Sequence, residues 1–414
     1  MIKINRTLMA TAVAVAVYLP VQNASAFELP IAGGRWGGGA QGDAASVTWS
    51  VAPDGTSISN FSSSGSELPA PSDLVSRLRG IYGDADIAGD TNYVGETWFG
   101  HVNEAYNRWS QLSGLTMTYE PNDDGAPYNG ATGAPGVRGD MRIGGHAIDG
   151  SGGILAYNFF PSSGGDGVYD TLGNSYENLL NDSRKLRNVV MHEVGHGLGL
   201  DHTSGVPDNL MNASTPVNPT FDGPQLDDIL GIQRLYGDAN EKNGGNDTIA
   251  TATDLGALTS GVPVAIGQDA IDQAVGRYET DFISIDGTSD TDVFMFTIGA
   301  GGMLDALMTP LGPSQNGDDY AAFSDLSLEL LDSLGNVIVS DNDGLAGEAE
   351  GFTDFLLLAG DYFLRIGGGD DFAQFYGLQL SFAEEETVVA SVPAPGAALL
   401  FLLGVGAIAV RRRL

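Results

Sequence analysis

Residues 189–202, with the sequence VVMHEVGHGLGLDH, constrain this chain more than any other stretch. His192 and His196 are four residues apart, so on a helix both imidazoles project from one face and can share one zinc ion. A continuing helix would carry His202 about 240° away from that face, so the helix must end before it. Gly199 can adopt the positive φ that turns the chain back toward the metal. The spacing therefore predicts a helix, a turn and a zinc ion held by three histidines.

Three histidine ligands leave a fourth coordination position open, which is typical of a catalytic zinc rather than a structural one. Glu193 lies next to the first histidine and off the ligand spacing, so it is the candidate base for a water in that position. The alternative is that these histidines are ordinary core or surface residues. The chain has only five histidines and three of them fall in this stretch, which favours the metal site.

The composition excludes nucleic acid as a partner, and it excludes disulfides and thiolate metal ligands. The chain has 53 acidic and 18 basic residues in 414, a formal net charge of −35. Nucleic acid is excluded as a partner because so acidic a chain cannot neutralise phosphates. The carboxylates are mostly a solvated surface, but they also supply ligands for calcium. Cysteine is absent, so no disulfide or thiolate zinc ligand is available, and the length predicts two folded units plus appendages.

The pattern His-Glu-x-x-His-x-x-Gly-x-x-His over residues 192–202 resembles the signature of the metzincin zinc peptidases. Residues 47–237 resemble the matrixin branch, because an opening strand, a long helix, the Ile-Asp-Gly and Leu-Ala-Tyr loop, Gly-Gly-Asp and a closing Leu-Asp-Asp-Ile-Leu-Gly follow in matrixin order. Ala213 stands where some other branches carry a tyrosine. The resemblance implies peptide-bond hydrolysis by an α+β domain over residues 27–237, a twisted mixed sheet with long helices. It also implies that Met211 is the Met-turn residue beneath the metal.

Periodicity predicts the helices of this domain. Apolar residues at intervals of three and four predict an amphipathic helix over residues 93–113 and another over residues 225–236, which Gly237 ends. The zinc helix is expected to begin near Asp182 or Ser183, because either side chain can cap free backbone amides.

The glycine-rich segment over residues 144–170 is a candidate calcium site. Asp149, Asp166 and Asp170 are spaced among glycines that allow carboxylates and backbone carbonyls to surround a hard cation. The alternative is a solvated connection without a metal.

The sequence departs from the matrixin pattern in two respects: the ligands of a second, structural zinc and the propeptide cysteine that blocks the catalytic metal. Many matrixins hold a structural zinc in these loops, but Tyr157 and Val168 stand where its ligands would be expected. His146 alone is insufficient, so we predict one zinc per chain and no structural zinc. Matrixins also commonly block the catalytic metal with a propeptide cysteine, which this chain lacks.

The residues after 237 show a different sequence pattern. Residues 238–247 are polar and predict a linker. Residues 248–384 contain short alternating strands separated by Gly, Asp and Asn turns, which predicts an all-β sandwich, jelly-roll-like in our expectation. The strand Asp-Val-Phe at 292–294, the turn Leu-Asp-Ser-Leu-Gly-Asn at 331–336 and Ala-Gly-Asp-Tyr at 359–362 resemble the bacterial pre-peptidase C-terminal domain. This region contains no histidine, so a binding, spacing or secretion-associated role is expected there.

Both ends of the chain carry targeting patterns. Residues 1–26 have the charged, apolar and small-residue order of a secretory signal peptide, and a membrane anchor is the alternative. In residues 385–414, a Pro-rich motif, an apolar run and three arginines resemble the PEP-CTERM sorting signal of Gram-negative bacteria. That resemblance implies export through the inner membrane, an exosortase-type partner, membrane contact before processing, and a place on the cell surface or in the extracellular matrix. A plain transmembrane anchor is the alternative.

Together these patterns predict a secreted or surface-displayed zinc metalloendopeptidase acting on proteins or peptides. The alternative is a matrix-associated binding or adhesion protein that keeps the metzincin scaffold without catalysis.

Overall fold

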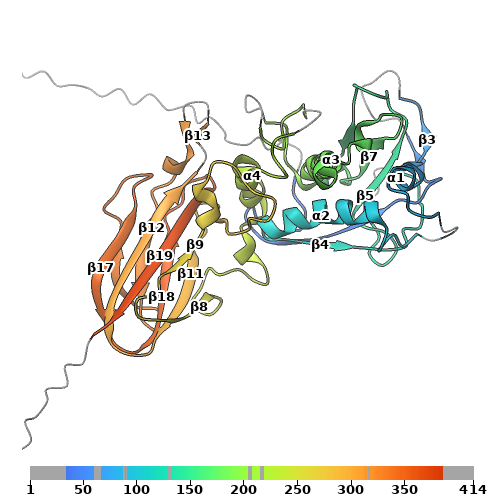
Figure 1. The fold of residues 1–414 in the computed structure, drawn as a ribbon. Coiled ribbons are helices and arrows are strands. Elements are labelled where there is room, and N and C mark those ends of the chain that lie inside the picture. The colour runs from blue at the N-terminus through green and yellow to red at the C-terminus, as the bar shows by residue number, and fades with distance from the viewer. Residues whose placement is uncertain are drawn as a thin grey trace, which may run out of the picture.

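The computed structural model describes residues 34–59, 67–86, 89, 91–128, 133–203, 208–214, 219–312, 314–315 and 318–385. These residues form a helix-containing part and a sheet-rich part that lie next to each other (Figure 1). The predicted signal peptide and, apart from its first residue, the predicted sorting tail lie outside the described residues. Within the described residues, no helix is both long and apolar enough to span a membrane.

The first part is built on a five-stranded mixed sheet with the order β4-β1-β5-β7-β6. Its strands are β1 (Ala45–Val51), β4 (Leu115–Tyr119), β5 (Met141–His146), β6 (Ala156–Asn158) and β7 (Gly167–Asp170). Four of them run parallel, whereas β6 pairs antiparallel with β7 at the edge. The mixed sheet predicted for this region is confirmed. Within the described residues, its edge strand β6 pairs with β7 alone.

Four helices accompany this sheet, namely α1 (Leu74–Tyr82), α2 (Thr97–Leu112), α3 (Leu180–Leu198) and α4 (Leu226–Tyr236). The two helices predicted from periodicity correspond to α2 and α4. The apolar face of α2 is buried against the sheet, where the rings of Trp49 and Tyr106 stack at 4.0 Å between centroids. At α4, Gln225 and Asp228 form a capping box, and Gly237 follows the last helical residue. This core holds the helices in place around the histidines.

The start of α3 differs from our expectation. Asn181, Asp182 and Ser183 have φ values of 52°, 58° and 55°, so they form a left-handed turn before the right-handed helix begins. Neither Asp182 nor Ser183 acts as the predicted side-chain cap. The Asp182 carboxylate instead accepts from Arg187 at 3.2 Å and from Arg277 at 2.7 Å. The Asp182 carboxylate is thus held by one nearby and one distant arginine, and such charge-assisted hydrogen bonds are stronger than a bond from a neutral backbone amide.

The sheet-rich part contains two five-stranded sheets. The first has β9 (Val264–Ile266), β10 (Ile283–Ile285), β12 (Gly302–Leu311), β17 (Glu350–Leu357) and β19 (Gln374–Glu384). The second has β8 (Thr253–Leu258), β11 (Asp292–Ile298), β15 (Ser327–Leu331), β16 (Val337–Asp341) and β18 (Gly360–Gly367). One apolar cluster draws residues from both sheets, and burial alternates along β12 as expected for a strand with one face in a core. A two-sheet arrangement is thus present, while the jelly-roll topology stays a prediction.

Short elements complete the chain. The two-residue strands are β2 (Ser57–Ile58), β3 (Ala70–Pro71), β13 (Ser314–Gln315) and β14 (Asp318–Asp319). The 3-10 helices are η1 (Pro161–Ser163), η2 (Ser175–Glu177), η3 (Ala239–Glu241), η4 (Gln268–Ile271) and η5 (Tyr320–Ala322).

The two parts share a packed interface rather than a solvated connection. One apolar cluster combines Leu226, Ile229 and Leu230 of α4 with Phe282 and Phe375 of the sheet-rich part. In Figure 1, α4 lies on the side of the helical part that faces the sheets.

The segment predicted as a linker is part of this interface. Asp238 is buried, and its carboxylate accepts from the backbone N–H of Ser284 at 3.1 Å. Asn246 is buried as well, and its carbonyl accepts from Val293 N–H at 2.8 Å. Asp238 and Asn246 thus anchor this polar segment at the interface, while Asn243, Gly244 and Asp247 are exposed. The exact domain boundaries stay predictions.

Candidate metal centre

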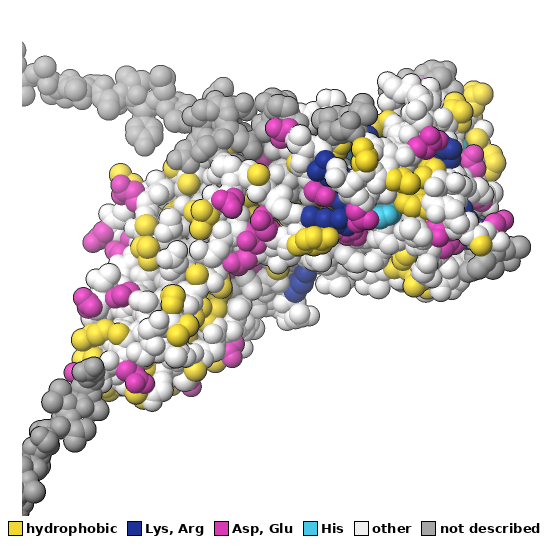
Figure 2. All heavy atoms as spheres, viewed as in Figure 1, with side chains coloured by type: hydrophobic (Ala, Val, Ile, Leu, Met, Phe, Trp, Pro, Cys, Tyr) yellow, Lys and Arg dark blue, Asp and Glu magenta, His cyan; other side chains and the backbone are white. Residues whose placement is uncertain are grey.

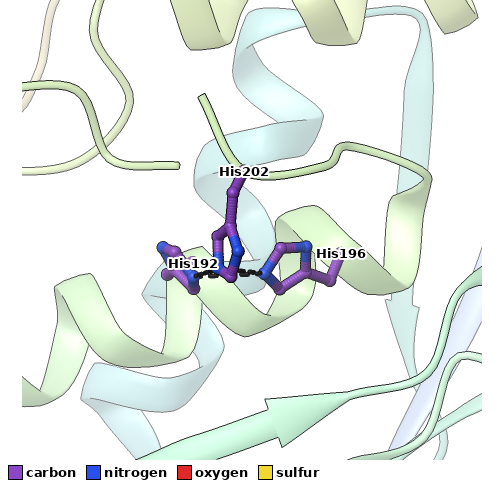
Figure 3. A group of neighbouring side chains, drawn as sticks. All are labelled: His192, His196 and His202. Atoms are coloured by element: carbon purple, nitrogen blue, oxygen red, sulfur yellow. Dashed lines mark hydrogen bonds between the residues drawn. The ribbon is translucent and has the colours of Figure 1, made fainter. Parts of the chain in front are cut away.

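Two elements bring the three histidines together, as Figure 3 shows. His192 and His196 are buried, one turn apart on α3. Gly199 follows the helix with φ 110°, and its N–H donates to the carbonyl of His196 at 3.0 Å. The chain then reverses, so that His202 approaches the same point. The predicted turn at Gly199 is present, because the left-handed conformation ends the helix where the third ligand must turn back.

The three imidazoles converge through their Nε2 atoms. The Nε2 of His192 lies 3.2 Å from that of His202, and the other two pairs are 3.1 Å apart. Nitrogen ligands of a tetrahedral zinc ion, with bonds of about 2.0–2.1 Å, lie about 3.3 Å from one another. The observed separations fit a zinc ion, and the residues form one of the groups able to hold a metal.

The opposite ring nitrogens set the protonation state of two of these ligands. His192 Nδ1 lies 2.7 Å from the carbonyl oxygen of Leu210, and His196 Nδ1 lies 2.8 Å from that of Leu200. A carbonyl only accepts, so each Nδ1 carries the proton and each Nε2 keeps a lone pair for the metal. Burial, with the neighbouring imidazole, lowers the pKa of His192 to about 3 and that of His196 to about 4. Both therefore stay neutral at physiological pH, as zinc ligands must.

Glu193 lies on the same helix and lines the same cavity as the histidines. Its Oε2 is buried, and no hydrogen-bond partner is found for it among the described residues. Burial raises the pKa of this carboxyl to about 8. An unpaired buried oxygen beside three inward-facing nitrogens fits a metal ion and a water that the carboxyl can contact.

Met211 lies beneath the metal-binding helix, as the Met-turn prediction expects. A Cβ placed on Gly195 would lie 2.5 Å from Met211 Sδ, so the sulfur packs directly against the helix at this glycine. The Met211 side chain is buried, and its carbonyl accepts from Thr203 N–H at 2.9 Å. The methionine thus gives the helix an apolar support, and its role as the Met-turn residue stays a prediction.

Sequence reasoning missed Asp228, which holds the Met-turn from α4. Its carboxylate accepts from the N–H of Leu210 at 2.8 Å, Met211 at 2.9 Å and Gln225 at 2.8 Å. Burial raises the pKa of this carboxyl to about 6, although the three backbone hydrogen bonds oppose the shift. Two acidic residues in the first turn of α4 were the available signal, and they resembled an ordinary cap.

The three predicted calcium ligands each bind backbone amides instead of sharing a centre. Asp149 accepts from Ile154 N–H at 2.9 Å, Asp166 from Arg142 N–H at 3.0 Å, and Asp170 from three N–H groups at 2.8, 2.9 and 3.1 Å. Burial raises the pKa of Asp166 to about 7. Within the described part of the chain, the groups of potential metal ligands do not include them. Calcium at this loop stays a prediction.

His146, the histidine of the loop where many matrixins hold a second zinc, belongs to a hydrogen-bonded cluster. Its Nε2 lies 2.9 Å from Glu67 Oε1, which also accepts from the Tyr157 hydroxyl at 2.7 Å. His146 and Glu67 are both buried. Glu67 thus connects Tyr157 and His146 by hydrogen bonds. The absence of a structural zinc stays a prediction.

Two further groups of potential ligands lie away from the histidines. His101, Glu104 and Asp182 form one, and Arg277 bridges its two carboxylates at 2.5 and 2.7 Å. The other lies at the interface between the two parts and comprises Glu241, Asp247 and Asp290.

Comparisons with known proteins agree with this geometry over part of the chain. The family model described as "Matrixin" matches residues 92–237. Matrix metalloproteinase-2 of Drosophila melanogaster is 38% identical over 98 residues, which is 22% of this chain and 13% of that protein. Human matrix metalloproteinase-26 is 37% identical over 101 residues, or 23% of this chain and 36% of that protein. Human matrix metalloproteinase-16 is 33% identical over 152 residues, or 33% of this chain and 23% of that protein.

The chain therefore spans well under half of the length of these relatives. A solved pre-peptidase C-terminal domain of the collagenase from Bacillus anthracis shows 16% identity and a TM-score of 0.20, covering 32% of this chain and 93% of that one. A likeness that low carries no argument about the sheet-rich part. The matched family, the relatives and the converging histidines together support a matrixin-like metallopeptidase in the first part of the chain.

Proposed function

We propose that this protein is a secreted or surface-displayed zinc-dependent metalloendopeptidase. The observation that carries the proposal is the meeting of three neutral imidazoles, with Nε2 atoms 3.1–3.2 Å apart, beside the unpaired carboxyl oxygen of Glu193. The cavity that these residues line measures about 910 Å³, which is large enough for part of a peptide.

Different residues would bind the metal, transfer the proton and align the substrate during hydrolysis. When bound by His192, His196 and His202, zinc would polarise the scissile carbonyl and lower the pKa of a bound water to about 7. Glu193 would take the proton of the attacking water on its carboxylate and pass it to the leaving amine. The edge strand β6 lines the cavity, and in the part of the chain that the structure describes β7 is the one strand that pairs with it, so an extended peptide could pair along its other edge and align its backbone across the histidines.

The test is peptide cleavage by the Glu193→Ala variant. We expect it to bind one zinc per chain, because the ligands are untouched, and to lose cleavage of an unfolded protein substrate. Glu384→Ala, which removes an exposed carboxylate at the end of β19, is the matched control and should cleave normally. Unchanged cleavage by Glu193→Ala would refute the assignment. One bound zinc in the wild type without any cleavage would favour the non-catalytic binding protein.

Location and further partners are proposals that the sequence patterns at the two ends support. We propose export across the inner membrane of a Gram-negative bacterium and sorting by an exosortase-type partner to the surface or matrix. Calcium is proposed as an additional structural cation, because acidic residues greatly outnumber basic ones. Figure 2 shows many acidic side chains over the visible face of the sheet-rich part.

A further inference from the structure

The cavity beside the histidines continues along one face of α3. Lys185, Val189, His192 and His196 all line it, at intervals of four, three and four residues, which places their side chains on one face of the helix. Lys185 precedes His192 by two turns, about 10 Å along the helix axis. The metal ligands therefore occupy one end of this stripe and Lys185 the other.

Two segments form the other walls. Residues 152–158, including β6, line the cavity, and so do Ala213 and Ser214, just after the Met-turn. A peptide paired with β6 and crossing the histidines would direct a side chain next to the scissile bond into this space. That side chain would pass Val189 and meet Lys185.

Lys185 is an unusual residue to find in such a wall. The residue is only 5% exposed, and it keeps an interaction within the protein, as a buried lysine usually does. Burial lowers its pKa to about 8, so the ammonium is still mostly protonated at pH 7. Among the described residues that line the cavity, it is the one Lys or Arg side chain.

An ammonium has three N–H donors, so Lys185 can keep a contact within the protein and still donate to a ligand. A carboxylate brought next to it would form a charge-assisted hydrogen bond in a largely dehydrated space, where such a bond is strong. A basic side chain in the same place would be repelled.

We propose that Lys185 determines specificity and selects substrates with a Glu or Asp side chain next to the scissile bond. This inference rests on the proposed peptidase function and names the substrate class of that same cavity. A neutral amide of the same size, such as Gln, matches the shape of Glu and lacks the charge, so it separates shape from electrostatics.

An apolar side chain is the competing occupant. The lysine stem and Val189 would offer it an apolar surface while the ammonium turned away. In that case Leu would be preferred over Glu, and removing the charge of Lys185 would improve or leave unchanged the cleavage of acidic peptides.

The experiment compares peptides that differ at one residue. A peptide library first locates the cleaved bond, and matched peptides with Glu, Gln, Leu or Lys in the flanking positions are then compared by kcat/KM. We expect wild type to prefer Glu over Gln by about 10- to 100-fold, as a hydrogen bond to a charged group implies. Lys185→Met should bring this ratio close to one, and Lys185→Glu should favour the Lys peptide.

Two further variants separate charge from structure. Lys185→Arg keeps a cation and should keep the preference for Glu. Arg184→Met removes a positive charge one residue away, on a side chain that donates to Thr220 and does not line the cavity, so it should leave the ratio unchanged. Thermal unfolding of each variant shows whether the fold is kept.

A binding measurement makes the test independent of catalysis. The same peptides are titrated into zinc-loaded Glu193→Gln and into the double variant with Lys185→Met, and fluorescence anisotropy gives their affinities. Tighter binding of the Glu peptide that is lost with Lys185→Met supports the proposal even if wild type cleaves nothing, in which case only the peptidase function fails. Cleavage without preference for Glu, or equal binding of the Glu and Gln peptides, would overturn the role of Lys185.

Discussion

The Nδ1–H of His192 donates a 2.7 Å hydrogen bond to the carbonyl of Leu210, whose own N–H donates to Asp228 at 2.8 Å. One peptide segment thus connects a metal-ligating imidazole to a buried carboxylate on α4. The connection orients His192 from outside α3, and mutating such a support typically lowers metal affinity or activity by about 10- to 100-fold.

The first prediction concerns Asp228→Asn. An amide can accept only through one oxygen, so its NH2 group would face a backbone N–H of Leu210 or Met211 and loosen the Met-turn. We expect zinc affinity to fall by about 10- to 100-fold, measured by competition with a chelator. Asp254→Asn, on the exposed side of β8, is the matched control. Equal zinc affinity in both variants would contradict this role.

The second prediction concerns Gly199→Ala. The left-handed conformation alone costs an L-residue about 1–2 kcal/mol, and the added Cβ would lie 2.6 Å from the carbonyl oxygen of Gly34. Gly55→Ala provides the comparison, because Gly55 has φ 93° with open space around it. Urea unfolding should show a larger loss of stability for Gly199→Ala than for Gly55→Ala. A loss of stability no larger than that of Gly55→Ala would mean that the backbone at Gly34 moves away from the added Cβ at no measurable cost.

The third prediction is a pH dependence at the interface between the two parts. Burial, followed by repulsion from neighbouring carboxylates, raises the pKa of Glu241 to about 9 and that of Asp286 to about 8. A raised folded-state pKa means that the folded chain holds the proton longer than the unfolded chain, whose carboxyls titrate near pH 4. The contribution of these groups is therefore fully present below about pH 4 and is lost as the pH rises toward 9.

Glu241→Gln isolates this effect, because Gln resembles the protonated carboxyl at every pH. In the presence of a chelator, the melting temperature of Glu241→Gln should exceed that of wild type by a margin that grows between pH 5 and pH 9. Glu384→Gln should show no such growing margin. A margin for Glu241→Gln that shrinks with rising pH would show that the neighbouring charges stabilise the ionised glutamate.

The fourth prediction concerns Arg277, which joins the two parts. Its guanidinium contacts the Glu104 carboxylate of α2 at 2.5 Å and Asp182 at the start of α3 at 2.7 Å. Arg277→Ala would leave these carboxylates with less positive charge nearby, at a cost of about 1 kcal/mol because the group is partly exposed. Limited proteolysis within residues 238–247 should become faster.

Arg365→Ala is the control for this effect. Arg365 on β18 pairs with Glu329 on β15 within the second sheet, so its loss should not alter cleavage between the parts. Equal protease sensitivity of wild type and Arg277→Ala would show that the apolar cluster around α4 holds the interface without this ion pair.

Local geometry explains which features were predictable. The spacing of His192, His196 and His202 with Gly199 defines a metal face and a turn, because helical periodicity and glycine conformation act within a few residues. The same reasoning located α2 and α4. The same reasoning could also have placed Lys185 on the helical face of His192 and His196, because its spacing from them follows the helical period. The spacing does not show, however, that Lys185 is buried.

The sequence by itself therefore determined that His192, His196 and His202 converge, and it determined the main elements of the first part, while the zinc ion and the role of Glu193 as base stay predictions. Tertiary structure decided the rest, since it depends on residues that meet only after folding. Asp228 reaches the Met-turn across 18 residues, Arg277 meets Asp182 across 95, and these contacts outweigh local preferences such as the expected cap of α3. Asp238 and Asn246 of the polar segment 238–247 are buried for the same reason, because backbone amides of β10 and β11 donate to the Asp238 carboxylate and to the Asn246 carbonyl.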